Sequence, residues 1–108
     1  MKEVDFNEAI TRSQKIRELY HELERQHHGS EWTIEEDALA FLTDAGLVGR
    51  LTMSQQGRWP KGDKTIPELE HKLGESIWWL IILADRMDIN IQDALEAFLT
   101  KTEKLLEK

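Results

Sequence analysis

The stretch Ile77-Trp78-Trp79-Leu80-Ile81-Ile82-Leu83-Ala84 is apolar at every position. It lies inside a helix that the spacing predicts from about Ile66 to Met87, whereas a surface helix has only one apolar stripe. A chain of 108 residues with four helices can hardly cover every side of it. We therefore expect part of this helix, and of the helix before it, to pack against a second copy of the chain. The alternative is that three neighbouring helices of the same chain cover it.

Capping patterns predict four helices. Three helix starts resemble a capping box and the fourth has an asparagine cap; they are Asp5-x-x-Glu8, Thr33-x-x-Glu36, Thr65-x-x-Glu68 and Asn90 before Asp93. Gly29-Ser30 ends the first helix, and the second runs from about Ile34 into Met53. No segment shows the alternation of a half-buried strand. The sequence therefore predicts an all-α fold, with four helices in a single domain of residues 1–108.

Composition argues against several classes of function. The chain has no cysteine, which excludes disulfides and thiolate metal sites. The 14 basic and 21 acidic residues give a net charge of -7, which argues against a general nucleic-acid binder. The longest apolar run, Ile77 to Ala84, is far shorter than the roughly 20 residues of a membrane-spanning helix. Residues 1–5 contain no apolar signal core, so we expect a cytoplasmic protein.

Two acids interrupt apolar helical stretches. Asp44 follows Ala40-Phe41-Leu42-Thr43, and Glu75 lies just before the apolar run of the third helix. A carboxylate on or beside a core face is costly unless it is paired, hydrated or bound to a cation. Each acid therefore needs a partner, and the two could share one.

The segment Gln55 to Lys64 is predicted to be a loop, because it contains two glycines and a proline. It carries three basic residues, Arg58, Lys61 and Lys64, and the aromatic ring of Trp59. One interpretation is a flap that meets phosphates and stacks on a base. The other, which sequence alone favours, is a solvated loop whose tryptophan packs against its own helices.

The order of these parts resembles the MazG-like family of all-α nucleoside triphosphate pyrophosphohydrolases, and its short members above all. The resemblance spans about Trp32 to Lys108. It rests on an acid-containing helix, a variable loop, a helix with Leu73-Gly74-Glu75 before a tryptophan-rich run, and then Leu83-Ala84-Asp85-Arg86-Met87-Asp88-Ile89-Asn90-Ile91. It implies a MazG-like helical bundle completed by dimerisation, assembled as a dimer or a dimer of dimers. It also implies Mg²⁺ bound by four acids, and cleavage of a nucleoside triphosphate to a monophosphate and pyrophosphate.

The four positions that match the family's acids keep only two of them. Asp44 and Glu75 are present, but Leu47 and Lys72 occupy the other two positions. A leucine cannot ligate Mg²⁺, and two carboxylates hold this ion only weakly. We expect the Lys72 ammonium to replace the missing cation by pairing with Asp44, Glu75 or both. The alternative is that Lys72 points to solvent and both acids are hydrated.

Other residues extend the predicted site. Asp37 and Glu68, each two turns before one of the acids, and His71, four residues before Glu75, are the nearest groups that could help to restore a metal site. For a histidine on the flank of a helix, surface exposure is the commoner explanation, and we do not predict a zinc site. The resemblance places Trp32 and Trp79 where the family often contacts the base, although both could simply pack in a core or a dimer interface.

Three functions follow from these observations. The first is a MazG-like protein with an incomplete Mg²⁺ site, which is weakly active or inactive and could still bind a nucleotide. The second is a working Mg²⁺-dependent pyrophosphohydrolase that uses Asp44, Glu75 and further residues. The third is a dimeric helical interaction module without enzymatic activity. Leu47 and Lys72 favour the first.

Overall fold

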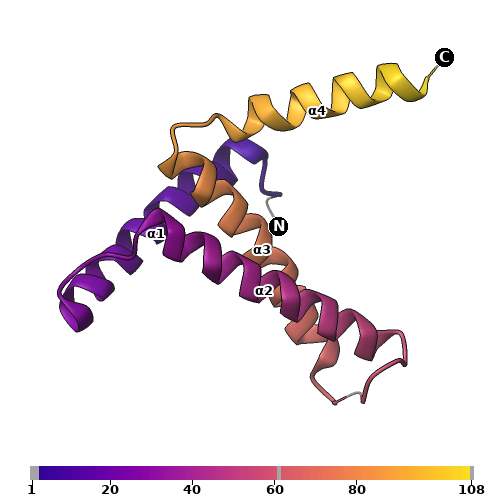
Figure 1. Cartoon of the computed structure of the whole chain (residues 1–108), viewed down its shortest axis with the longest axis horizontal. Helices are drawn as coiled ribbons and strands as arrows, with labels where there is room; N and C mark the ends of the chain where they lie inside the picture. Colours follow the sequence, from indigo (N-terminus) through magenta and orange to yellow (C-terminus); the bar gives the residue numbers. More distant parts are fainter. Residues whose placement is uncertain (1–2, 61, 108) are drawn as a thin grey trace.

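The computed structural model describes residues 3–60 and 62–107, and the regular structure in these ranges is entirely helical. The chain forms α1 (Phe6–His28), α2 (Ile34–Gln55), α3 (Thr65–Arg86) and α4 (Ile91–Leu106). Figure 1 shows α2 and α3 running side by side in opposite directions, while α1 crosses α3 nearer its C-terminal half. The all-α prediction is therefore confirmed for the described residues.

Side-chain caps begin three of the helices as predicted. Asp5 accepts a hydrogen bond from the Glu8 backbone N–H at 2.8 Å. Thr33 and Glu36 form a reciprocal capping box at the start of α2. Asn90 accepts from the backbone N–H of Asp93 at 3.0 Å. These bonds satisfy N–H groups that lack an intrahelical acceptor.

The capping box predicted at Thr65 is wrong. Thr65 is the first residue of α3, and the residue before it, Lys64, makes no side-chain capping bond. The Thr65 hydroxyl instead donates to the Gly62 carbonyl at 3.0 Å and accepts from the Gly62 N–H at 3.1 Å. A threonine hydroxyl can bond to nearby backbone groups in place of capping a helix, and here these bonds fix the end of the loop.

The core consists of the predicted apolar stretch. Its buried hydrophobic residues all belong to α3: Trp79, Ile81, Ile82 and Ala84. Helix α2 covers one side of α3 along most of its length, and α1 covers a second side. Part of α3 nevertheless remains uncovered, since 59 % of Ile77 and 46 % of Leu80 are exposed. The chain's own helices therefore do not hide the whole stretch, contrary to the alternative stated above.

Helix α4 packs against the rest of the chain only through limited contacts with α3. Figure 1 shows it projecting away from the other three helices. Its apolar stripe faces solvent over most of its length, with Phe98 63 % exposed and Leu105 61 % exposed. An isolated helix of this length is marginal in water, so the stripe indicates a surface that is suited to a further contact.

The molecule is more extended than a compact domain of its size. Its radius of gyration is 16.7 Å, against about 13 Å for a compact domain of this length. Its accessible surface is 8456 Å², against about 6,200 Å² for a compact monomer of this mass. Within the described residues, no helix is both long enough and apolar enough to cross a membrane.

Candidate functional site

The Lys72 ammonium lies between the two acids singled out in the sequence. Its Nζ atom is 3.0 Å from Oδ1 of Asp44 on α2 and 2.9 Å from Oε1 of Glu75, one turn further along α3. The second oxygen of Asp44, Oδ2, accepts a hydrogen bond from Trp79 Nε1 at 2.8 Å. Both carboxylate oxygens of Asp44 are thus engaged, and the predicted contact of Lys72 with both acids is present.

The electrostatics of this cluster favour its charged form. Burial opposes ionisation of Asp44, but the Trp79 N–H and the Lys72 ammonium outweigh it and hold the pKa of Asp44 below its ordinary value. Hydrogen bonds to Glu75 and then to Asp44 raise the pKa of Lys72, against the effect of burial. Lys72 therefore stays protonated and Asp44 ionised across the neutral range, so the ion pair persists there.

Lys72 links the four positions singled out in the sequence, because it contacts both Asp44 and Glu75 and lies beside Leu47. Leu47 and Lys72 line the same cavity, of about 360 Å³. Leu51 and Pro67 add apolar surface to its wall, and the remaining lining residues are charged or polar: Arg50, Lys64, Glu68 and His71. The positions thus converge, but they present one alkyl group, one ammonium group and two carboxylates.

This donor set does not fit a divalent metal cluster. Mg²⁺ requires oxygen ligands in an octahedral arrangement, whereas Leu47 offers none and Lys72 brings a positive charge. Among the described residues, no three carboxylate or imidazole side chains converge in a way that could hold a metal ion.

Asp37, considered above as a helper, belongs to a separate buried cluster. It is fully buried, and Arg17 on α1 donates to both of its oxygens, from Nη2 at 2.9 Å and from Nε at 3.2 Å. Arg86 on α3 donates to Asp37 Oδ2 at 2.8 Å. The cluster ties three helices together, and two guanidinium groups already occupy the acceptor sites of Asp37.

Glu24 extends this cluster to Trp32. It accepts from Arg17 at 3.0 and 3.3 Å and from the Trp32 backbone N–H at 2.8 Å. Burial raises the pKa of Glu24, but these hydrogen bonds outweigh it and the net shift is downward. Arg86 donates to the Trp32 carbonyl at 2.9 Å. Both backbone polar groups of Trp32 are thus held, which positions its ring at the junction of α1 and α2.

An aromatic cavity of about 590 Å³ lies next to the Lys72 cluster. Trp32, Trp79 and Glu75 all line it. Its other walls come from α1 and from Trp78, through residues Arg17, Tyr20, Leu23, Glu24, His27, His28 and Trp78. The Tyr20 and Trp78 rings meet edge to face at 5.8 Å, and those of Trp78 and Trp79 at 4.7 Å. The cavity therefore offers several aromatic surfaces to a flat ligand.

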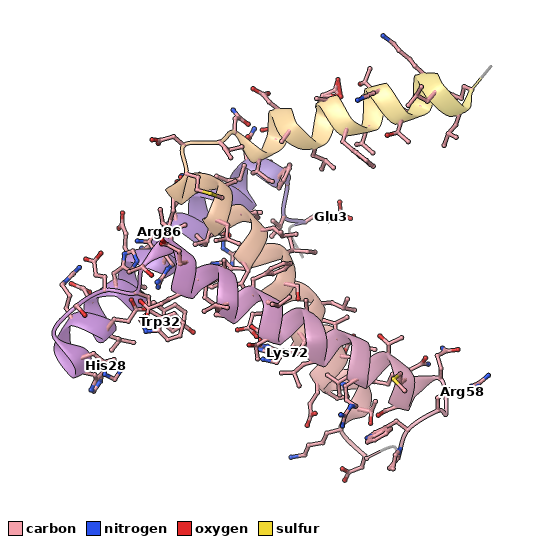
Figure 2. The ribbon with its side chains drawn as sticks, in the orientation of Figure 1. Glu3, His28, Trp32, Arg58, Lys72 and Arg86 are labelled. Atoms are coloured by element: carbon pink, nitrogen blue, oxygen red, sulfur yellow. The ribbon has the colours of Figure 1, made fainter. Side chains whose placement is uncertain are left out.

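The structure does not bring the predicted loop residues to this cavity. Figure 2 shows Arg58 at the opposite end of the α2–α3 pair from Trp32. The guanidinium of Arg50 on α2 lies over the Trp59 ring, with its Cζ atom 4.2 Å from the ring centre. The loop tryptophan therefore packs against a helix of its own chain, as the alternative favoured by the sequence predicted. Lys64 lines the smaller cavity beside Lys72. Lys61 lies outside the described residues.

Sequence reasoning missed the contribution of α1. The resemblance begins at about Trp32, so it carried no information about Arg17, Tyr20 or Glu24. One signal was available: Arg17 and Glu24 are seven residues apart, two helical turns, and therefore share a face of α1. That spacing indicates a charged pair on an otherwise apolar face, but it does not reveal Asp37 as their partner.

Comparisons with known proteins provide no independent assignment. No family model matches the chain, and no curated protein or solved structure is significantly similar to it.

Proposed function

We propose that this chain is a MazG-like helical protein in which the Lys72 ammonium takes the place of a divalent cation, so that it binds a nucleotide without efficiently hydrolysing it. The observation that supports the proposal most strongly is the position of Lys72 Nζ, within 3.0 Å of both Asp44 and Glu75. The single positive charge there offsets part of the negative charge that the two acids bring beside the core.

An ammonium group cannot supply the chemistry of a metal pair. Metal ions catalyse phosphate hydrolysis by lowering the pKa of a bound water and by clamping the attacking and leaving oxygens. Lys72 can donate hydrogen bonds and offset charge, but it cannot coordinate and ionise a water molecule. We therefore expect pyrophosphohydrolase activity to be weak or lost.

Ligand binding does not require that chemistry. The aromatic cavity has a volume in the range of ordinary small-molecule sites, which is roughly 300–1,000 Å³, and its walls include Tyr20, Trp32 and Trp78. Such rings suit a nucleobase. Glu75 belongs both to this cavity and to the Lys72 cluster, so a base in the cavity would place its sugar and phosphates near the ammonium group.

Self-association is part of the same proposal. The uncovered stripe of α3 and the projecting α4 support a dimer or a dimer of dimers. The same surfaces would also suit a purely structural interaction module, which is the second candidate function. Only ligand binding distinguishes the two.

Two measurements test the proposal. Pyrophosphate release should be followed over a panel of nucleoside triphosphates with Mg²⁺ or Mn²⁺, and tryptophan emission should be titrated with the same nucleotides in EDTA. We expect little or no release and saturable quenching. Brisk metal-dependent turnover would contradict the loss of catalysis, and an absence of quenching would favour the interaction module.

A double variant, Leu47→Glu with Lys72→Glu, refines the activity test. It restores oxygen donors at both altered positions and removes the ammonium. Gain of metal-dependent release in this variant alone would show that the scaffold is competent and only the ligands were lost. If neither protein reacts, the inferred substrate class loses its support.

A further inference from the structure

Helix α2 carries a second apolar face, away from α3. Leu39, Leu42, Gly46, Gly49 and Met53 follow one another at spacings of three and four residues, so they form one stripe along the helix. The stripe lies roughly opposite Asp37 and Asp44, which face the other helices. Leu39 is 64 % exposed, Leu42 65 % and Met53 45 %. No contact within the described chain accounts for this face.

The two glycines in the stripe have no explanation within the chain. A Cβ atom at Gly46 or Gly49 would meet nothing within 4 Å, and neither residue has the positive φ that favours glycine. Glycine inside a helix is destabilising relative to alanine. The glycines are accounted for if another helix approaches α2 closely at this point, where a side chain would obstruct it.

The order of residues along four positions of the stripe fits a second copy of α2 as that helix. Leu42 and Met53 lie at equal distances from the midpoint between residues 47 and 48, and so do Gly46 and Gly49. An antiparallel copy of α2 about a two-fold axis at this midpoint would place Leu42 against Met53 of the partner subunit. Gly46 would lie against Gly49 of the partner subunit. A self-complementary pattern of this kind is what an isologous interface requires.

We propose that α2 crosses α2 of a second copy of this chain, antiparallel and closest at Gly46 and Gly49. The accessible surface of the whole chain is large enough for an interface with a second copy. The chain exposes 8456 Å², roughly 2,200 Å² more than a compact monomer of its mass. A standard protein interface takes roughly 800 Å² from each partner. The excess thus accommodates this contact together with a second one at α3 or α4.

This inference deepens the proposed self-association and is independent of nucleotide binding. Asp44 and the aromatic cavity use the other side of α2, so the crossing can form whether or not a ligand is bound. The experiment below measures association alone. Its failure would leave the nucleotide proposal standing, and failure of nucleotide binding would leave the crossing standing.

Cysteine cross-linking tests the geometry, because the chain has no cysteine of its own. The double variant Leu42→Cys with Met53→Cys should form a covalent dimer under mild oxidation. The single variants Leu42→Cys and Met53→Cys should remain uncrosslinked, because each residue would be about 16 Å from its own copy along an antiparallel pair, beyond the roughly 7 Å limit between Cα atoms of a disulfide. The same distance prevents a bond within one helix.

Glycine substitutions in the otherwise unmodified chain give a second measurement. Gly46→Ala and Gly49→Ala should each weaken dimerisation by about tenfold or more in sedimentation equilibrium, because the added methyl groups obstruct the crossing. Gly74→Ala is the matched control: it is also a mid-helix glycine with open space around it, but it lies on α3. It should leave the dimer Kd within about twofold, and a larger effect would assign the measured dimer to the uncovered stripe of α3 near Gly74 instead of to α2.

The outcomes divide clearly. Efficient cross-linking of the double variant, with weakened dimers for the α2 glycine variants only, supports the crossing. Efficient cross-linking of either single variant would overturn the antiparallel arrangement. A monomeric unmodified chain, or unchanged dimerisation of the Gly46→Ala and Gly49→Ala variants, would overturn the interface itself.

Discussion

The ammonium nitrogen of Lys72 lies 3.0 Å from Oδ1 of Asp44, across the interface of α2 and α3. The side chain of Asp44 is only 12 % exposed and that of Lys72 25 % exposed, so solvent screens the pair weakly. Because the second oxygen of Asp44 is bound by Trp79, the carboxylate is fully partnered without a metal ion. The arrangement joins α2 to α3 at the place where, in the proposed function, the ammonium group takes the position of a metal ion.

Replacing Lys72 with methionine should destabilise the fold by about 2 kcal/mol, because it leaves the Asp44 carboxylate partly buried with only the Trp79 N–H. Urea unfolding followed by circular dichroism measures this change. The controls are the single variant Asp44→Asn and the double variant Asp44→Asn, Lys72→Met. The double variant should lose less free energy of unfolding than the sum of the losses of the two single variants. Additive losses would mean that the pair contributes nothing to stability.

Replacing Asp37 with asparagine should be more damaging, at about 3 kcal/mol or more, since it removes the negative charge between Arg17 and Arg86 in a fully buried position. Thermal and urea unfolding would both reveal it. Asp63→Asn, at an exposed loop position, is the matched control and should change stability by less than about 0.5 kcal/mol. Similar effects of the two substitutions would refute the structural role of the Asp37 cluster.

His21 should make stability depend on pH just below neutrality. Burial and the nearby Arg17 lower the pKa of His21 from 6.5, with Glu31 partly opposing them. Its Nε2 atom is buried without a hydrogen-bond partner among the described residues. The unfolded chain therefore binds more protons than the folded one below pH 6.5, and stability falls as pH decreases from that value.

The free energy of unfolding should be compared at pH 7 and pH 5, because Asp44 and Glu24 titrate mainly below this interval. Their ordinary pKa values are 3.8 and 4.5, and the fold lowers both. A His21→Gln variant should lose less free energy of unfolding over this interval than the unmodified chain. An equal loss in both proteins would assign the pH dependence to other groups.

The aromatic cavity predicts which tryptophan reports a ligand. Trp32→Ala should raise the apparent Kd for the nucleotide, measured by quenching of tryptophan emission, by about tenfold, since removal of one stacking ring costs roughly 1–3 kcal/mol. Trp59→Phe should leave the Kd unchanged, because Trp59 packs on Arg50 in the distant loop. Equal effects of both substitutions would place the ligand elsewhere.

The sequence was sufficient to predict the local features of this fold. Helix starts at Asp5, Thr33 and Asn90 were predictable because each cap depends on residues within one turn. Thr65 was not, because its hydroxyl has a competing partner in Gly62 that the sequence does not reveal. The contact of Lys72 with Asp44 and Glu75 was one of two alternatives that the sequence left open, because a lysine side chain can equally point to solvent.

The long-range features were harder to predict. The sharing of Asp37 by Arg17 and Arg86 requires knowledge of how α1 crosses α3, which periodicity does not provide. The projection of α4 was also unpredicted, since its apolar stripe fits packing within the chain as well as packing against another chain. Both depend on tertiary arrangement rather than on local sequence.

Titration with Mn²⁺, followed by its paramagnetic signal, tests most directly whether Lys72 replaces a cation between Asp44 and Glu75. We predict no saturable binding by the unmodified chain up to about 1 mM, which corresponds to roughly 4 kcal/mol of binding free energy. The Leu47→Glu, Lys72→Glu variant should bind the ion more tightly. Micromolar binding by the unmodified chain, abolished by Asp44→Asn and by Glu75→Gln, would contradict the account.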